Sequence, residues 1–133
     1  MKKRKAIKKE KGSILEPRFT DEDRAREYLE AVRWPNGAVC PHCGVEGESY
    51  RIAVKEKTPE QIEALRKAKK RVRKARKGLW ACGGCRQQFS VTVKTIFEDS
   101  HIPLHKWLLA FHLINASKKG MSAHQLMRML DIR

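Results

Sequence analysis

The chain has 133 residues, of which 41% are hydrophobic and 34% are charged. This balance is typical of one compact soluble domain or two very small ones, and the lack of a long apolar run excludes a membrane-spanning helix. The lysine-rich N-terminus has no apolar segment behind it, which excludes a secretory signal and favours the cytosol, where thiols stay reduced.

The formal net charge of +15 is concentrated in two segments. Residues 1–11 carry seven Lys or Arg and one Glu, and residues 55–77 carry eleven Lys or Arg and three Glu. The rest of the chain is nearly neutral. Two separate clusters of one sign favour a polyanionic partner over a role in solubility alone.

The N-terminal region is predicted to be a disordered basic tail over residues 1–17. A helix is then expected from an N-cap at Thr20, with Asp23 in the capping-box position, to about Arg33. It should end there because Pro35 disfavours helical geometry at the preceding residue. Its predicted buried stripe consists of Ala25, Tyr28, Leu29 and Val32.

The middle of the chain is predicted to hold a cysteine knuckle and strand over residues 38–54, then a basic helix over residues 58–77. Thr58 is the expected N-cap, and Gln61 completes a capping box. The apolar stripe of this helix is narrow, so we expect it to project from the body. The stripe consists of Ile62, Leu65, Ala68, Val72 and Ala75.

The second half begins with another knuckle, followed by a strand predicted over residues 88–93 from its alternating pattern. Helical spacing of apolar residues predicts two helices, over residues 103–116 and 122–130. Ser122 is the expected N-cap of the second.

Four cysteines stand in two C-x₂-C pairs separated by thirty-eight residues: Cys40, Cys43, Cys82 and Cys85. Two residues between thiolates allow both sulfurs to grip one tetrahedral ion, so the pattern predicts one structural Zn²⁺ with no open position for a catalytic water. Disulfides, a redox dithiol and rubredoxin-like iron remain alternatives. His42, inside the first knuckle, is expected to be an exposed turn residue rather than a ligand.

The predicted fold is a small α+β protein. A Cys₄ zinc ribbon of β-hairpins carries an N-terminal helix, an inserted basic helix and a C-terminal helical pair. The expected organisation is a tail over residues 1–17, the ribbon with its helices over residues 18–100, and a helical region over residues 101–133 that resembles the start of a helix-turn-helix.

The motifs of the chain resemble the N-terminal zinc-ribbon region of bacterial insertion-sequence transposases over roughly residues 19–132. The matching positions are Arg33, Trp34, Pro35 and Gly37; Cys40, Pro41, Cys43 and Gly44; Cys82, Cys85, Phe89 and Ser90; Thr95, Phe97, Ser100, Pro103, Leu104 and Trp107; and Lys118, Gly120, Ser122, Gln125 and Leu126. The basic insertion and the lysine-rich tail depart from that pattern.

The resemblance implies a ribbon and a partial helix-turn-helix that bind transposon ends during DNA transposition and recombination, in the bacterial cytoplasm and associated with the nucleoid. Full-length relatives would be transposases whose separate RNase H-like domain supplies the catalytic carboxylates. That domain is absent from this sequence, and the carboxylates present are of helix-cap or surface types. We therefore expect no enzymatic activity, no catalytic residues and no small-molecule substrate.

DNA is the expected partner, bound mainly through its phosphates. The predicted contacts from the tail are Lys2, Lys3, Arg4, Lys5, Lys8 and Lys9. Those from the inserted helix are Lys69, Lys70, Arg71, Arg73, Lys74, Arg76 and Lys77. Base contacts are expected from Arg86, Gln87 and Gln88 beside the second knuckle.

Two other functional classes fit parts of the sequence. An RNA-binding or ribosome-associated zinc ribbon would share the composition, although it needs neither C-terminal helix. A protein-binding module would use Trp34, Trp80 or Trp107 as an anchor, whereas their apolar surroundings favour core positions. A homodimer is left open.

Overall fold

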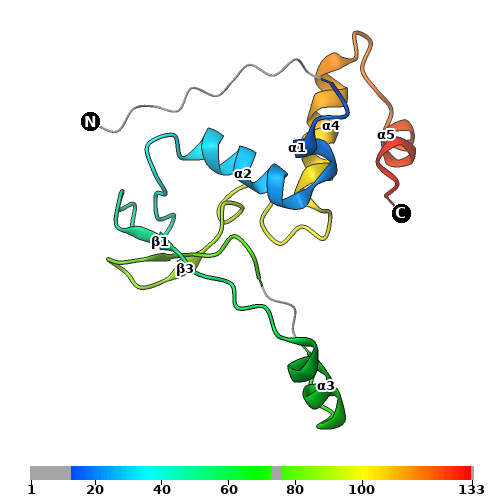
Figure 1. The fold of residues 1–133 in the computed structure, drawn as a ribbon. Helices are drawn as coiled ribbons and strands as arrows, with labels where there is room; N and C mark the ends of the chain where they lie inside the picture. The colour runs from blue at the N-terminus through cyan, green and yellow to red at the C-terminus, as the bar shows by residue number, and fades with distance from the viewer. Residues whose placement is uncertain (1–12, 73–75, 133) are drawn as a thin grey trace.

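The computed structural model describes residues 13–72 and 76–132, so what is predicted for residues 1–12, 73–75 and 133 lies outside it. The described chain is a small α+β fold whose elements are α1 (Pro17–Thr20), α2 (Glu22–Arg33), β1 (Ser49–Arg51), α3 (Pro59–Lys67), β2 (Trp80–Cys82), β3 (Gln88–Phe89), α4 (Leu104–Ala116) and α5 (Ala123–Leu130). The helices α1, α2 and α4 lie to one side of the small sheet, and α3 stands away from it (Figure 1).

The sheet is antiparallel with the order β1-β2-β3. Tyr50 pairs with Ala81, and Ala81 pairs with Gln88 on the other side. The backbone N–H of Ile52 donates to the carbonyl of Leu79 at 2.9 Å, which extends the β1–β2 pairing outward by one step. The long insertion between β1 and β2 therefore leaves the ribbon from the end of a hydrogen-bonded hairpin.

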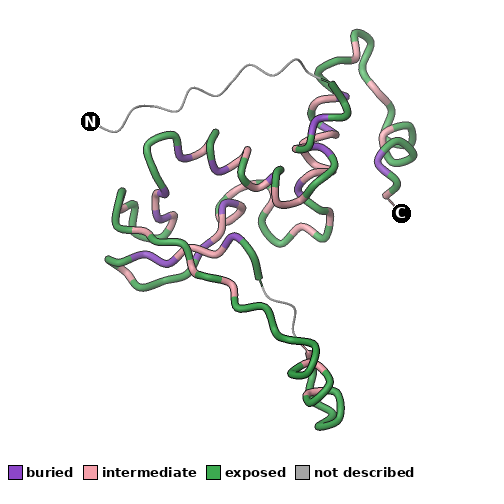
Figure 2. The backbone as a smooth tube through the Cα atoms, in the orientation of Figure 1, coloured by how far each residue is buried: buried purple, intermediate pink, exposed green. Residues whose placement is uncertain are grey.

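The core of the ribbon is built from aromatic residues and cysteines. Trp34, Phe89 and Val91 are buried together with two of the cysteines. The Trp34 ring meets the rings of Trp80 and Phe89 edge-on, with centroids 5.9 and 5.6 Å apart. This buried zone lies where α2 ends beside the sheet (Figure 2). The core position predicted for Trp34 is confirmed, whereas Trp80 and Trp107 are only partly buried.

A second packed region joins the helices. Phe19 of α1 is buried, and its ring centroid lies 4.9 Å from that of His112 on α4. Farther along α4, Ala110 and Leu113 pack with Leu130 of α5. The helices α4 and α5 agree with their predicted bounds, and the Ser122 side chain accepts a hydrogen bond from the N–H of Gln125 as expected of an N-cap.

Three local predictions outside the inserted helix are wrong. Thr20 ends α1, and Asp21 instead caps α2 by accepting from the N–H of Asp23. The strand predicted over residues 88–93 ends at Phe89, because the chain then enters consecutive turns that bury Val91. Val32 is 49% exposed and lies outside the buried face of α2.

The inserted helix α3 begins as predicted but ends at Lys67 rather than at residue 77. Thr58 and Gln61 form the expected capping box. At the other end Lys69 adopts a left-handed φ of 51°, and the N–H of Lys70 donates to the carbonyl of Leu65 at 2.9 Å. This is a Schellman motif. Like charges one turn apart beyond Leu65 disfavour further helix, and no packing against the body offsets them.

Candidate metal centre and nucleic-acid interface

The two knuckles have the same backbone geometry although their sequences differ. In the first, the N–H of Gly44 donates to the carbonyl of Cys40 at 2.9 Å; in the second, the N–H of Arg86 donates to that of Cys82 at 3.0 Å. Gly44 has a φ of 76° and Arg86 a φ of 59°. Arg86 therefore holds a left-handed conformation that costs a residue with a Cβ about 1–2 kcal/mol.

The knuckles bring all four cysteines together. Their Sγ atoms lie within 4.8 Å of one another, and among the described residues this is the group of His, Cys, Asp or Glu that converges as a metal site. Cys40 and Cys85 are 3.6 Å apart at sulfur, and Cys43 and Cys82 are 3.5 Å apart. A zinc ion with bonds of about 2.3 Å to four sulfurs requires sulfur separations of about 3.8 Å. The donor set thus fits one structural Zn²⁺, held by four thiolates.

The ionisation of the thiols reflects their crowding. Burial raises the pKa of Cys40. Hydrogen bonds from the N–H groups of Cys43 and His42 and from neighbouring thiols outweigh that effect and lower the pKa to about 6. For Cys85, the N–H of Gln87 lowers the pKa, whereas burial and the other three thiols raise it to about 12. Four thiolates this close together repel one another, and a divalent metal ion would offset their negative charge.

Close backbone approach supports the centre. The N–H of Gly83 donates to the carbonyl of Glu48 at 2.9 Å, and a Cβ on Gly83 would lie 2.9 Å from that same oxygen. Only glycine fits there. Lys94 donates from its Nζ to the carbonyl of Pro41 at 2.6 Å, which ties the first knuckle to the turns after β3. His42 is exposed, as expected.

A buried carboxylate fixes α2 to the sheet, and the sequence did not reveal it. Glu30 is 9% exposed. Its Oε1 accepts from the indole N–H of Trp80 at 3.2 Å, and its other oxygen pairs with Arg51 on β1. Glu30 is next to Leu29 of the predicted apolar face, which is only a weak indication that Glu30 is buried. Its partners become visible only in the tertiary fold.

Arg33 makes a similar connection at the end of the same helix. Its guanidinium donates to the carbonyls of Val91 and Val93, at 2.6 and 2.9 Å. Burial lowers the pKa of Arg33 below its ordinary value. This arginine orders the turns that follow β3 and is therefore a structural residue of the RWP motif.

The predicted nucleic-acid contacts lie in separate places. Lys69, Lys70 and Arg71 are exposed just after α3, and Arg76 is exposed on the return segment. Arg86, Gln87 and Gln88 are exposed beside the second knuckle. The remaining predicted contacts lie outside the described chain: Lys2, Lys3, Arg4, Lys5, Lys8, Lys9, Arg73 and Lys74.

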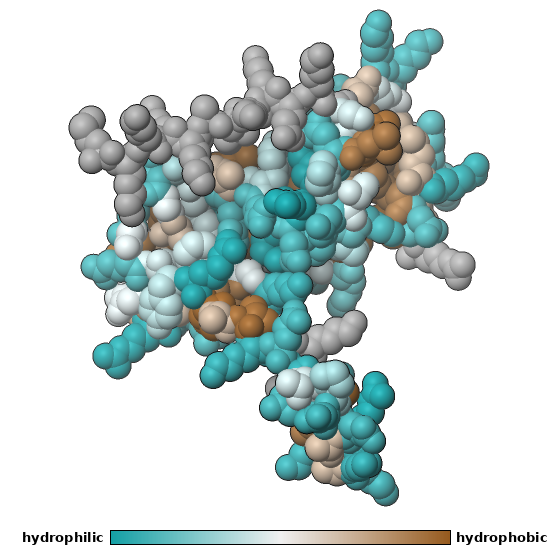
Figure 3. All heavy atoms as spheres, in the orientation of Figure 1, coloured by the Kyte–Doolittle hydropathy of each residue, from teal (hydrophilic) through white to brown (hydrophobic). Residues whose placement is uncertain are grey.

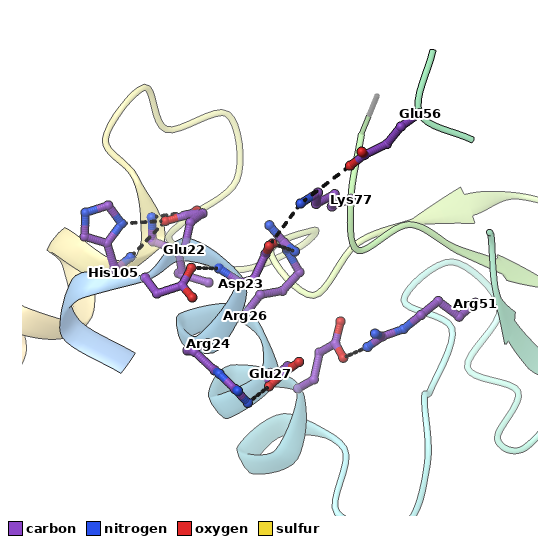
Figure 4. Close-up of polar contacts among 12 residues, drawn as sticks. Glu22, Asp23, Arg24, Arg26, Glu27, Arg51, Glu56, Lys77 and His105 are labelled. Carbon is purple, nitrogen blue, oxygen red and sulfur yellow. Dashed lines mark hydrogen bonds and ion pairs between the residues drawn. The ribbon is translucent and has the colours of Figure 1, made fainter. Parts of the chain in front are cut away.

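Lys77 is exposed but already engaged in ion pairs. Its Nζ lies 3.2 Å from a carboxylate oxygen of Asp23 on α2 and 3.9 Å from one of Glu56 (Figure 4). Hydrogen bonds from Arg26 and Lys77 hold the pKa of Asp23 below its ordinary value. The pairs place Lys77 at the base of the insertion, where it links both of its ends to α2.

Together, two knuckles from a three-stranded antiparallel sheet and four converging thiols define a zinc ribbon. Residues 20–88 match the family model described as the transposase zinc-ribbon domain. The chain belongs to that family.

A relative from Halobacterium salinarum supports the same context. It is described as an uncharacterized protein in transposable element ISH50, and it is 30% identical over 112 residues. The match covers 79% of this chain but 30% of the relative, so the chain spans less than a third of that protein's length. No solved structure matches the chain significantly. Within the described ranges, no helix combines the length and apolarity that crossing a bilayer requires.

Proposed function

We propose that this chain is the DNA-binding zinc-ribbon region of a transposase and that it acts in the recognition of transposon ends. The observation that carries the proposal is a metal-organised ribbon that holds an exposed run of cations away from a nearly neutral body. Family membership and an insertion-element relative give the context. Cutting and joining of DNA would belong to another part of a longer protein, and nucleoid association would follow from DNA binding.

The placement of the cations suggests two kinds of DNA contact, one to phosphates and one to bases. Lys69, Lys70 and Arg71 lie in a row past α3, where nothing in the described chain pairs with them in a salt bridge. Phosphate contacts of this kind raise affinity without selecting a sequence. Arg86 instead sits on the rigid second knuckle, beside a zinc ligand. A guanidinium held on a fixed backbone is suited to bidentate contact with guanine.

The salt dependence of binding to duplex DNA tests the phosphate contacts. Replacing Lys69, Lys70 and Arg71 together by Gln removes three positive charges, so the slope of log K against log salt should become shallower by about 2.7. Thermal stability should not change, because these three side chains are exposed. Arg24→Gln, an exposed charge loss on α2, is the control. A slope equal to that of the wild type would refute the assigned role.

Arg86→Gly separates recognition from folding. Glycine adopts the left-handed conformation at this position more readily than arginine, so the zinc site should remain intact. Loss of a bidentate guanine contact should reduce discrimination between sites by about 1–3 kcal/mol. Competition between duplex DNA and structured RNA completes the test, because preference for RNA would favour the RNA-binding alternative.

A further inference from the structure

The helix α3 does not pack against the rest of the described fold. It contacts no other helix or strand of the described chain, and none of its residues is buried. Figure 1 shows it standing away from the sheet, and Figure 3 shows its largely hydrophilic surface interrupted by a few hydrophobic residues. An isolated helix of nine residues is marginal in water even with good caps. A packing partner outside the chain would supply the missing stability.

The partner must cover an apolar stripe. Ile62 and Leu65 lie three residues apart on one side of α3 and are only half-buried. DNA can neutralise the lysines and arginines that follow, but Glu60 and Glu63 stand beside Ile62, and DNA phosphates would repel these carboxylates. The stripe therefore fits a protein surface.

The charge pattern along the segment indicates which surface. Residues 55–63 carry three Glu and two Lys, whereas residues 64–72 carry five Lys or Arg and no acidic residue. Two copies packed antiparallel place the acidic half of each against the basic half of the other, and they oppose the two helix dipoles. A parallel pair would stack the two basic halves. Antiparallel pairing is also the two-fold, self-complementary arrangement that homodimers favour.

We propose that α3 is the contact between two copies of this chain bound side by side on DNA, with the Ile62 and Leu65 stripes packed antiparallel. This inference rests on the proposed function, because the two stripes alone bury too little surface for a stable dimer and DNA would hold the two copies close together. Two aliphatic residues from each copy fall far short of the roughly 1,200 Å² that stable interfaces bury. Two copies on one duplex meet at high effective concentration, and phosphates screen the repulsion between their cations.

The test compares binding to a short duplex with room for one copy and to a longer duplex with room for two. With the zinc-loaded full chain, the second copy should bind the longer duplex about tenfold more tightly than the first. Ile62→Gln with Leu65→Gln keeps charge and helix propensity but removes the stripe. This variant should bind the short duplex as the wild type does and lose the tenfold enhancement. Ala64→Gln, on the opposite side of α3, is the matched control.

Each outcome is decisive. Enhancement that survives the double substitution overturns the proposal. An apolar groove between α4 and α5 is lined by residues that include Ala110, Leu126 and Met127. Enhancement that disappears with Met127→Gln would assign the stripe to that groove and would overturn the α3 pair. Failure of the wild type to bind the short duplex refutes the proposed function instead. In that case sedimentation equilibrium at millimolar protein and high salt tests the α3 pair directly. A wild-type dimer that the double variant does not form supports the pairing, and a wild-type monomer overturns it.

Discussion

The ribbon and the basic insertion differ in how much apolar surface they bury. The ribbon buries Trp34, Phe89 and two cysteines around one metal centre. The insertion buries no residue of α3, and its structure is set by caps and charge. One chain thus separates a metal-organised region from a cationic segment whose helix packs against no other element of the described chain.

The largest expected effect is loss of the metal. Binding of structural zinc to four thiolates contributes about 10–16 kcal/mol in small domains at neutral pH, so chelation should unfold the ribbon. Cys82→Ser should do the same, because Cys82 is a buried ligand at the end of β2. Near-ultraviolet circular dichroism of Trp34 and Trp80, with zinc content by mass spectrometry, measures the change.

His42→Ala is the control for that experiment, since this exposed knuckle residue should leave both signals intact. A metal-free chain that keeps its tryptophan signal would show that the aromatic core alone holds the ribbon.

The next effect compares two ion pairs, one in each region. Glu30→Ala removes the buried carboxylate that accepts from the half-buried indole N–H of Trp80 and pairs with Arg51, and should cost about 1–3 kcal/mol. Glu63→Ala breaks an exposed pair with Lys67, 3.2 Å apart, and should change stability by no more than about 0.5 kcal/mol. Urea unfolding at a fixed concentration of free zinc measures both. Equal losses would contradict the idea that only the ribbon depends on such contacts.

These pairs also show what the sequence can reveal. The spacing of the cysteines is sufficient to predict the metal centre, because two residues between thiolates leave few geometries. The caps at Thr58 and Ser122 are equally local and are confirmed. Glu30 is different, since its partners Arg51 and Trp80 come from two strands distant in sequence, and helical periodicity carries no information about them.

The wrong boundaries share one physical cause. The end of α3 at Lys67 and the end of β3 at Phe89 are decided by what the following residues can pack against. Val91 lies outside the strand and is buried in the core beside Phe89. An alternating sequence pattern does not predict this burial. The placement of the basic residues on DNA stays a prediction.

A smaller, pH-dependent effect is expected where α2 meets α4. Glu22 accepts from the N–H groups of Leu104 and His105 at 3.0 and 3.2 Å, and from the His105 ring at 2.8 Å (Figure 4). Burial raises the pKa of Glu22, but these hydrogen bonds outweigh that effect and hold the pKa below its ordinary value of 4.5. The resulting stabilisation is complete above the ordinary pKa and is lost as pH falls through the folded value.

Glu22→Gln should therefore lower the Tm at neutral pH, with a difference from the wild type that shrinks below about pH 4.5. Because acid also releases zinc from thiolates, the readout is the difference between the two proteins at each pH. The same substitution at the more exposed Glu27 is the control. A difference that stays constant through the acid range would show that the carboxylate acts by packing alone.

The smallest effect isolates the insertion from the ribbon. Lys69 holds a left-handed φ of 51° at the end of α3, a conformation that glycine adopts at no steric cost. Lys69→Gly should stabilise the helix by about 0.5–1 kcal/mol, seen as slower amide exchange in Pro59–Lys67. Lys70→Gly removes the same charge one residue later, outside the left-handed region, and should not slow exchange. The Tm of the whole protein should not move, because α3 contacts no other helix or strand among the described residues; a rise would mean that the two regions fold as one unit.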